Sequence, residues 1–350
     1  MIVKKRIVKW LGWVANFTVI WTIGNCQVSL GQIIEDSTLS TQVEQLNDTF
    51  EIKGGTQVGN NLFHSFREFS VPNEQTASFV EQSPTIVNIF SRVTGSSISE
   101  IQGEIQANTN LFLLNPNGII FGQNASLNIN GSFLATTATQ INFADGSQFS
   151  TINPARNNLL TVTTPVGIQF GEQIGDITIQ DSNLSSVGSS FYLLGGDINI
   201  VNSNLSVGDL NPSVISGNLT LGGVAEPAVI SVLVDEGNIA ITPPVESIRR
   251  SDISISGRST LDVSGGKSGN LNVFADSLFL LEGSRLQSAT FSLGGEGKIT
   301  VDLNGEALIN GSEGERASSI FSIILSPDGG NGSDINIKAS SLTLSDRGQI

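Results

Sequence analysis

The strongest constraint on this chain is a short unit that recurs from residue 175 onward. Each copy is a Gly-Asp or Gly-Asn pair followed by an apolar-polar-apolar triplet. Four copies have their first apolar residue at Ile177, Ile198, Leu219 and Ile239, in steps of 21, 21 and 20. Later copies are spaced less evenly and begin at Ile253, Leu271, Ile299 and Ile335. An internal period indicates a repeat architecture in which each unit buries its apolar face against its neighbours.

A period of about 21 residues fits one coil of a parallel β-helix. Propeller blades need about 40–45 residues, and the consensus of leucine-rich repeats is missing. Helical stretches of about 10–15 residues, which βαβ units require, are missing as well. Period-two alternation places Ile177 and Ile179 in the apolar column and Thr178 outside it. The 38 glycines and the low charged fraction of 14% suit short strands joined by tight turns.

The first 31 residues have the three-part pattern of a secretory signal peptide. Four basic residues precede the apolar run 10–23, and Ser29-Leu30-Gly31 offers small residues at a cleavage site. A membrane anchor is the alternative, but the run contains Asn16 and is shorter than the about 20 residues that a spanning helix needs. A lipoprotein site at Cys26 is disfavoured because Asn25 precedes it, where a small residue is expected. We therefore predict a signal peptide over residues 1–31.

Export would leave a strongly acidic chain without cysteine. Residues 1–31 hold four positive charges and no negative ones, so the net charge changes from −15 to −15 − 4 = −19. Such a chain repels nucleic acid and anionic lipid, and neither is a predicted partner. The only cysteine, Cys26, lies in the predicted signal. Two interpretations stay open: a long β-helix has enough core without disulfides, or the chain crosses a second membrane unfolded, where a disulfide loop would block passage.

The segment before the repeats has its own pattern. Residues 33–58 alternate with period two, and Gly54-Gly55 supplies a turn between two strands. Residues 62–71 are ambiguous. Phe63, Phe66 and Phe69 are three apart, as on a helical turn, whereas Phe63, Phe69 and Val71 fit one face of a strand.

The sharpest local motif is the pentapeptide Asn115-Pro116-Asn117-Gly118-Ile119. Pro116 fixes its own φ, Asn117 tolerates a bridge or left-handed conformation, and Gly118 accepts a positive φ. The motif separates the apolar runs 111–114 and 119–121. Taken alone, it is explained by a tight turn between two buried strands, with no recognition role.

The surroundings of this turn resemble the filamentous haemagglutinin N-terminal family, which is the two-partner-secretion domain. Residues 110–122 are similar to the family hallmark. The stretch Asn61-Leu62-Phe63-His64-Ser65-Phe66, followed by Phe69, is similar to its other signature, and residues 91–95 with Ile101, Gly103 and Ile105 also match. The dense resemblance covers about residues 33–165, in the family's order. One departure is Gly59-Asn60-Asn61-Leu62, where some members have Asn-Pro-Asn-Leu, and it leaves the transporter subtype open.

The resemblance implies an export route and a set of recognition residues. Such proteins cross the inner membrane by the general export machinery, and an outer-membrane β-barrel transporter with periplasmic domains recognises their N-terminal domain. The chain then passes through unfolded and folds outside as a β-helix, as an adhesin-type protein secreted or held at the cell surface. Host or neighbouring cell-surface glycans or proteins are further expected partners. The secretion-recognition residues implied are Asn115, Pro116, Asn117, Gly118, Ile119, Asn61, Leu62, Phe63 and His64.

A carbohydrate-active enzyme, a polysaccharide lyase or hydrolase, is the alternative function on a β-helix. Such chemistry needs clustered carboxylates or a carboxylate with a positioned base. Asp and Glu lie mostly beside turn glycines, and stacking the chain at the repeat period aligns no acidic column. The only histidine, His64, is interpreted as structural, and no His or Cys metal cluster exists in the sequence. The sequence therefore predicts no enzyme, catalytic residue, metal or cofactor.

Two glycine-rich segments raise the question of calcium. Gly329-Gly330-Asn331-Gly332-Ser333-Asp334 resembles the calcium-binding nonapeptide repeat but fails at Asn336, where an aliphatic residue is required. Gly294-Gly295-Glu296-Gly297 forms a similar turn without the Asp. Both are interpreted as coil turns, and calcium binding is the minor alternative.

The predicted organisation is all-β: a right-handed parallel β-helix with a capped N-terminal secretion domain. The predicted domains are a signal peptide at 1–31, a two-partner-secretion domain at 32–165 and β-helix repeats at 166–350. Residues 269–286 align with 333–350 without gaps, an offset of 64 that suggests three coils. The second copy stops in mid-coil without a polar cap, so we expect a truncated or split form of a longer exoprotein whose distal part is adhesive or toxic.

Overall fold

The computed structural model describes residues 32–154, 160–186, 189–209, 211, 213, 215–235, 238–242, 248–292, 297–313, 316–326 and 332–350. One compact unit begins at Gly31 and runs to Ile350. The predicted signal peptide with Cys26 lies outside the described residues, as do Gly294-Gly295-Glu296 and Gly329-Gly330-Asn331 of the two glycine-rich turns. Within the described residues the chain forms strands and turns and no α-helix. None of the described residues form a helix able to cross a membrane.

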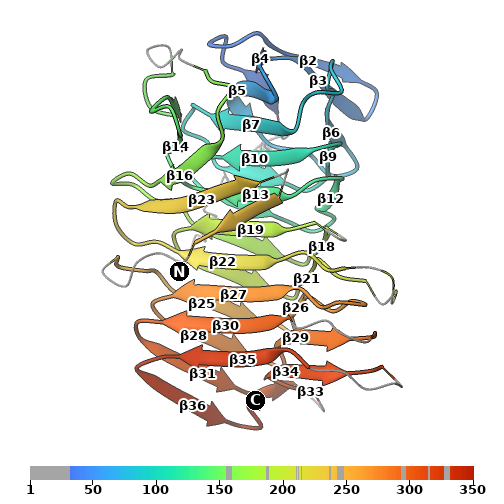
Figure 1. The fold of residues 1–350 in the computed structure, drawn as a ribbon, viewed down its shortest axis with the longest axis vertical. Coiled ribbons are helices and arrows are strands. Elements are labelled where there is room, and N and C mark those ends of the chain that lie inside the picture. Colours follow the sequence, from blue (N-terminus) through green and yellow to red (C-terminus); the bar gives the residue numbers. More distant parts are fainter. Residues whose placement is uncertain are drawn as a thin grey trace, which may run out of the picture. The chain divides into compact units, whose positions relative to one another are not determined.

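The compact unit is a right-handed parallel β-helix, with strands of successive coils stacked in register (Figure 1). One long sheet, sheet A, runs along the whole stack. Its order is β1 (Ile33–Glu35), β5 (Asn61–Phe69), β7 (Asn88–Val93), β10 (Asn110–Leu114), β13 (Phe133–Thr136), β19 (Phe191–Gly195), β22 (Leu219–Gly223), β27 (Asn270–Ala275), β30 (Lys298–Leu303) and β35 (Asp334–Lys338).

Two further faces complete each coil: sheet C forms one, and the other is formed by sheet B in the N-terminal coils and by sheet E from β18 onward. Sheet C contains β8 (Ser99–Ile101), β11 (Ile119–Phe121), β17 (Ile177–Gln180), β20 (Ile198–Val201), β25 (Ile253–Ser256), β28 (Leu278–Leu281), β31 (Glu306–Asn310) and β36 (Ser341–Ser345). Sheet B contains β2 (Thr41–Leu46), β3 (Thr49–Gly54), β6 (Thr76–Phe79), β9 (Glu104–Ala107) and β12 (Ser126–Ile129). Sheet E contains β18 (Asn183–Ser185), β21 (Asn204–Ser206), β26 (Thr260–Asp262), β29 (Arg285–Thr290) and β34 (Ser319–Ile324).

The N-terminal end of the stack is closed by antiparallel pairing. Strand β1 and strand β4 (Thr56–Val58) both pair antiparallel with β5, and β2 pairs antiparallel with β3. Gly54 and Gly55 make the predicted turn between β3 and β4 with φ of 67° and 77°. Tight turns at 47–48 and 59–60 join the antiparallel pairs β2/β3 and β4/β5, so this end is covered without a helix. The expected N-terminal cap is therefore present.

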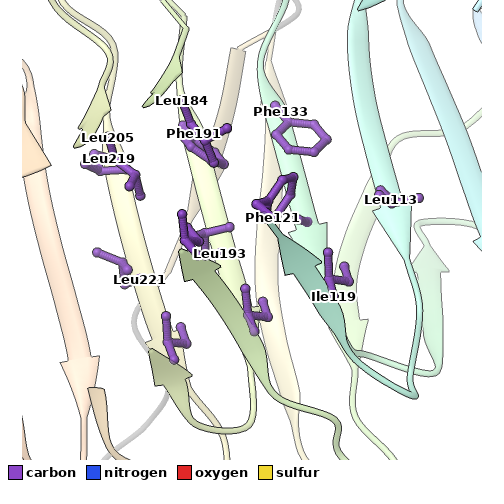
Figure 2. Close-up of a cluster of buried hydrophobic side chains, with 14 of the residues drawn as sticks. Leu113, Ile119, Phe121, Phe133, Leu184, Phe191, Leu193, Leu205, Leu219 and Leu221 are labelled. Atoms are coloured by element: carbon purple, nitrogen blue, oxygen red, sulfur yellow. The ribbon is translucent and has the colours of Figure 1, made fainter. Parts of the chain in front are cut away.

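The inward side chains form one apolar column. On β17, Ile177 and Ile179 are buried and Thr178 is half-buried, as period-two alternation predicted. Figure 2 shows side chains from neighbouring coils, including Phe121, Phe133 and Leu193, packed in this column. Each coil therefore buries its inner face against the coils before and after it.

A second core lies outside sheet A, under a separate antiparallel sheet that we call the cover sheet. Its strands are β14 (Gln140–Phe143), β15 (Gln148–Ser150), β16 (Pro165–Gln169), β23 (Val229–Asp235) and β24 (Asn238–Ile241). The cover sheet is built from two excursions that leave the coils after β13 and after β22 and return before β17 and before β25. It buries the outward residues of sheet A from Phe63 to Leu194.

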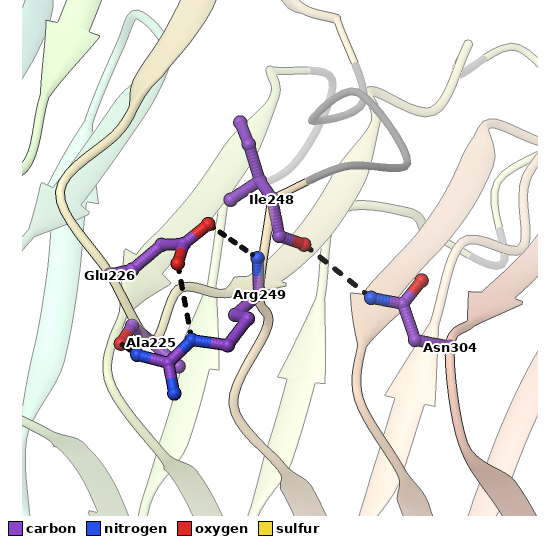
Figure 3. A network of polar contacts seen from close by, with 5 residues as sticks. All are labelled: Ala225, Glu226, Ile248, Arg249 and Asn304. Atoms are coloured by element: carbon purple, nitrogen blue, oxygen red, sulfur yellow. Dashed lines mark hydrogen bonds and ion pairs between the residues drawn. The ribbon is translucent and has the colours of Figure 1, made fainter.

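The second excursion is closed at its base by a salt bridge. The guanidinium of Arg249 donates from Nε to Glu226 at 3.1 Å, and the backbone amide of Arg249 donates to the same carboxylate at 2.9 Å. The side chain of Asn304, from the turn after β30, donates to the carbonyl of Ile248 at 3.4 Å (Figure 3). These contacts fix where the excursion leaves and rejoins the stack.

The cover sheet overturns the predicted repeat length. Ile177 and Ile198 do pair on consecutive coils of sheet C, but Leu219 lies in sheet A, and Ile239 lies in the cover sheet. Ile198 instead pairs with Ile253, across the second excursion. The prediction that each repeat of the unit is one coil was wrong because strands from different faces of the helix carry the same apolar-polar-apolar pattern.

The predicted count of coils in the offset of 64 was also wrong. Leu271 pairs with Ile299, and Ile299 pairs with Ile335, so the offset spans two coils and not three. The equivalence of the aligned residues themselves holds. In the last described coil Leu342 and Leu344 are each 47% exposed. The expectation that the repeats end in mid-coil stays a prediction.

Strand β5 settles the ambiguous segment 62–71 as extended structure. Phe66, Phe69 and Val71 face the inner column, whereas Phe63 faces the cover sheet. The helical alternative was therefore wrong, and so was the grouping of Phe63 with Phe69 and Val71 on one face. The side chains of β5 therefore change their in-out alternation between Phe66 and Phe69. A shift of register between Ile34 and Glu35, on the paired strand β1, accompanies this change.

Candidate secretion-recognition site

The pentapeptide 115–119 forms the predicted tight turn between β10 and β11. The amide of Gly118 donates to the carbonyl of Asn115 at 3.1 Å, and Gly118 has a positive φ of 127°. The amide of Asn117 donates to the side-chain oxygen of Asn115 at 3.0 Å. The side chain of Asn115 thus imitates a backbone turn, which explains why Asn and Gly stand at these positions.

Neighbouring coils clamp this turn on both sides. Toward the preceding coil, the side-chain amide of Asn115 donates to the carbonyl of Ser97 at 3.0 Å and to the hydroxyl of Ser99 at 2.9 Å. Toward the following coil, the amide of Gly175 donates to the carbonyl of Pro116 at 3.0 Å. A Cβ at Gly175 would stand 2.5 Å from the carbonyl carbon of Asn117, so this contact requires glycine.

Little of the motif is accessible once the coils have closed. Asn115 and Ile119 are fully buried, and Gly118 is buried as well. Pro116 and Asn117 are half-buried and form the accessible part of the turn. In the folded protein a partner could therefore contact these two residues, while the Asn115 amide is already occupied within the helix.

The second predicted group, at the start of β5, is held by an asparagine ladder. The side-chain amide of Asn88 donates to Asn61 Oδ1, and that of Asn110 donates to Asn88 Oδ1, both at 3.0 Å. Asn61 in turn donates to the carbonyls of Thr161 and Thr163, which lie just before β16 of the cover sheet. The ladder therefore aligns the first three full coils and fastens them to the cover sheet. Leu62 faces the inner column and Phe63 the second core.

His64 is buried in the inner column without a polar partner. Neither ring nitrogen has a hydrogen bond, and the ring lies 6.1 Å from Phe66 and 5.7 Å from Phe79, centroid to centroid. Burial lowers the pKa of His64 to about 3. The side chain is therefore neutral near pH 7. The backbone at Gly55 packs against its ring, which leaves no room for another side chain there.

Sequence reasoning missed a buried polar network around Arg92. Its guanidinium donates to the hydroxyl of Ser65 at 2.8 Å and to the carbonyl of Ser150 at 2.6 Å, and lies 4.6 Å from the Phe149 ring centroid. Burial lowers the pKa of Arg92 to about 10, against the opposing effect of Asp36. One signal was present: Arg92 interrupts the otherwise uncharged strand β7, where a buried charge requires partners.

Asp36 completes this network from the N-terminal cap. It accepts hydrogen bonds from the hydroxyls of Ser65 and Thr94 at 2.6 and 2.7 Å, and from Thr38. Burial alone would raise the pKa of Asp36, but these hydrogen bonds outweigh it and hold the pKa below its usual value. The network joins the cap, sheet A and the cover sheet at one point.

The structure does not bring the two predicted recognition groups together. Asn61 stands at the beginning of β5, and Asn115 follows the end of β10. The strands are parallel and β7 lies between them, so the two groups are at opposite edges of sheet A. They do not form one contiguous surface in the folded protein.

An aspartate column was also missed. Asp176 Oδ1 accepts the amide of Asp197 at 2.9 Å, and Asp197 Oδ1 accepts the amide of Asp252 at 3.1 Å. Asp252 Oδ1 accepts the amide of Ser277 at 3.0 Å. The prediction that no acidic column exists was wrong, because an excursion separates Asp197 from Asp252 in the sequence. Among the described residues, no group of His, Cys, Asp or Glu is arranged to hold a metal ion.

Comparison with known families decides what this coil stack is. The TPS secretion domain matches residues 31–301, which is most of the chain. The chain belongs to the TPS secretion domain family. TPS secretion domain proteins are exported through the outer membrane to the cell surface or the extracellular space, and the domain implies recognition by an outer-membrane transporter. The domain boundary expected at residue 165 stays a prediction, and both the family match and the coil stack continue past it.

Individual relatives of this TPS secretion domain protein resemble short stretches of it. A heme/hemopexin-binding protein of Haemophilus influenzae strain Rd is 47% identical over 47 residues, covering 13% of this chain and 5% of the relative. A second heme/hemopexin-binding protein of Haemophilus influenzae is 36% identical over 72 residues, covering 21% of this chain and 8% of the relative. The matches thus span less than a tenth of these relatives.

Two solved structures are also similar. The HMW1 secretion domain of Haemophilus influenzae superposes with a TM-score of 0.43 at 19% identity, covering 88% of this chain and 83% of the other. The filamentous hemagglutinin secretion domain gives a TM-score of 0.39 at 14% identity, covering 89% of this chain and 99% of the other.

Proposed function

We propose that this protein is the secreted partner of a two-partner-secretion pair and acts as an adhesin-type surface protein. The family membership over residues 31–301 supports the export route. Its partners would be the outer-membrane transporter and glycans or proteins on host or neighbouring cells. Its own chemistry would be binding without catalysis, because the aspartates of the exposed column hold backbone amides of the next coil.

The transporter would read the two motif groups before the coils close. In the folded protein the side-chain amide of Asn115 donates to Ser97 and Ser99. The side-chain amide of Asn61 donates to the segment before the cover-sheet strand β16. The two groups then stand at opposite edges of sheet A. In the unfolded chain the same residues are free to bind another partner. Recognition of Asn115 through Ile119, and of Asn61 through His64, therefore fits an unfolded substrate.

The test separates recognition from folding. Asn115→Ala removes the motif amide, and we expect secreted protein to fall about tenfold when the variant is co-expressed with its transporter, on the basis that a lost hydrogen bond to a partner weakens binding by about 1.4 kcal/mol. Immunoblots of medium and cell fractions measure the effect. Thermal melts of the purified variants measure the cost to stability.

Gly175→Ala is the matched control. Its new Cβ would strike Asn117 from the following coil, so the same turn is destabilised while the motif keeps its sequence. If the two variants lose equal stability but Asn115→Ala loses far more secretion, the motif is read by the transporter. Secretion that tracks stability in both variants would reduce the motif to a structural turn and contradict the proposal.

A further inference from the structure

Three arginines gather at the corner between sheets C and E, in a chain whose net charge is −15. Arg258 lies in the turn before β26, and Arg285 begins β29. Arg316 begins the second strand of the short hairpin of β32 (Ser312–Glu313) and β33 (Arg316–Ala317), which precedes β34. These strands belong to three consecutive coils, since β26 pairs with β29 and β29 pairs with β34. The stacking of the helix therefore brings together residues that are 27 and 31 positions apart in the sequence.

The reach of Arg316 shows how close the side chains lie. Its guanidinium donates to the hydroxyl of Thr260, two coils back, at 2.6 Å. Thr260 stands beside Arg285 in the register of sheet E, so Arg316 must cross the coil that carries Arg285. A Cβ at Gly283, in the turn before β29, would lie 3.5 Å from Arg316 Cγ, which places the stem of Arg316 directly over that turn.

No carboxylate among the described side chains forms an ion pair with these three arginines. Two carboxylates of the neighbouring turns and strands are engaged elsewhere: Glu282 accepts the amide of Gly257 at 3.0 Å, and Asp262 accepts from Gln287 and from the amide of Ser264. Burial, together with the positive charges of Arg285 and Arg258, lowers the pKa of Arg316. The folded protein thus keeps a cost from like-charge repulsion at this corner.

One observation indicates that the cluster is incomplete without a ligand. The Nε atoms of Arg285 and Arg316 are buried and have no hydrogen-bond partner among the described residues. Buried donors without acceptors are costly, and guanidinium groups match the two-pronged geometry of oxyanions.

We propose that Arg258, Arg285 and Arg316 form an oxyanion site that holds a carboxylate, sulfate or phosphate group of an acidic polysaccharide. A polysaccharide suits the surroundings because the outward row of sheet E continues from Arg285 with neutral hydrogen-bonding side chains. On the N-terminal side Thr260, Asn204 and Asn183 stand in register with it. Such groups bind sugar hydroxyls. The inference rests on the proposed adhesin role and names a ligand class and a site for it.

The experiment measures binding on the purified secreted protein, so that a failure of secretion or of cell adhesion does not decide it. Titration calorimetry at constant ionic strength compares polygalacturonate, dextran sulfate and neutral dextran. We expect both anionic polymers to bind and neutral dextran to give no heat of binding. In the variant R285Q/R316Q the affinity should fall about tenfold or more, as expected for lost charge-assisted hydrogen bonds.

The control variant R67Q/K267Q removes the same number of positive charges at exposed positions elsewhere and should bind as the wild type does. R285K/R316K keeps the charge but loses the two-pronged fork, and its affinity should lie between the two. A second readout is thermal unfolding: inorganic phosphate should stabilise the wild type and the control but not R285Q/R316Q. This readout also reports whether the variant is folded.

Three outcomes would overturn the site. Equal binding by R285Q/R316Q and the control would show only general charge attraction. Binding that appears only in E313Q/E315Q would show that the neighbouring glutamates in the sequence neutralise the arginines. Binding to vesicles of phosphatidylglycerol, with none to the polysaccharides, would assign the cluster to a lipid surface instead.

Discussion

The first five full coils and the last four differ on the outer face of one sheet. A single outward row of sheet A runs through all nine in register: Phe63, Phe90, Phe112, Leu134, Tyr192, Thr220, Asn272, Thr300 and Asn336. The row is aromatic or aliphatic through Tyr192, under the cover sheet, and polar from Thr220 onward. The inward row beside it, from Leu62 to Ile335, is apolar throughout.

This difference shows which part of the pattern belongs to the helix and which to its cover. The inner row is required by every coil, whereas the outer row reports whether another sheet lies above it. Strands β10 and β19 are buried on both faces and have almost continuous apolar sequences, while β30 alternates. Strands covered on both faces lose the alternation that marks a half-exposed strand.

The largest expected effect comes from opening the second core. Phe112→Ala should lower the free energy of unfolding by about 3–5 kcal/mol, because it removes a fully buried ring between β10 and the cover sheet. Thr300→Ala, in the same row beyond the cover, should change it by less than about 0.5 kcal/mol. Denaturant titration followed by circular dichroism measures both. Equal effects would show that the cover sheet adds no stability.

A somewhat smaller effect is expected at the joint between cap and cover. Arg92→Met keeps the bulk of the side chain but leaves the Ser150 carbonyl without its donor and Asp36 without its neighbouring positive charge, and should cost about 3 kcal/mol. Hydrogen exchange should show loss of protection in β1 and β15 in particular. The control is Arg67→Met, where the side chain is 61% exposed. Full hydrogen-exchange protection of β1 and β15 in Arg92→Met would show that Arg92 does not hold the cap and the cover sheet together.

The smallest effect is a dependence on pH confined to the first coil. Because the pKa of His64 is lowered to about 3 in the folded state, protons bind the unfolded chain first as pH falls below 6.5. Stability should therefore be complete above about pH 6.5 and fall by about 1.4 kcal/mol per unit below it. Melts between about pH 7 and 5 avoid the titration of most carboxyl groups.

His64→Leu should abolish this dependence, since His64 is the only histidine in the chain. Phe79→Leu changes the same cluster without removing the titrating group and should retain the slope. If the stability of His64→Leu still fell with pH at the same rate, the titrating group would be a residue other than His64.

The coil architecture and its inner column could be predicted from sequence because they follow period-two alternation. Ile177 and Ile179, and the turn at Asn115 to Gly118, lie where local chemistry placed them. The coil length could not be predicted, because Leu219 and Ile239 carry the same pattern as Ile198 while belonging to other sheets. Local alternation reports that a strand is half-buried, and it contains no information on which strand is its neighbour.

The cover sheet and the polar networks escaped prediction for the same reason. The acceptors of Arg92 come from segments 27 to 62 residues away. Asp197 and Asp252 become neighbours only when an excursion between them is folded aside. The cover sheet could have been inferred from the continuous apolar runs 111–114 and 191–194, since a strand apolar on both faces must be covered on both.

The aspartate column gives the stack a direction of growth. Three successive coils present a carboxylate that accepts an amide of the next coil, from Asp176 to Asp197, to Asp252 and to Ser277. A chain emerging through the outer membrane from its N-terminus would meet this waiting acceptor with each new segment. Each new hydrogen bond would have to break before the chain could slide back into the pore. The free energy of folding outside the cell would then bias the random motion of the chain in the outward direction.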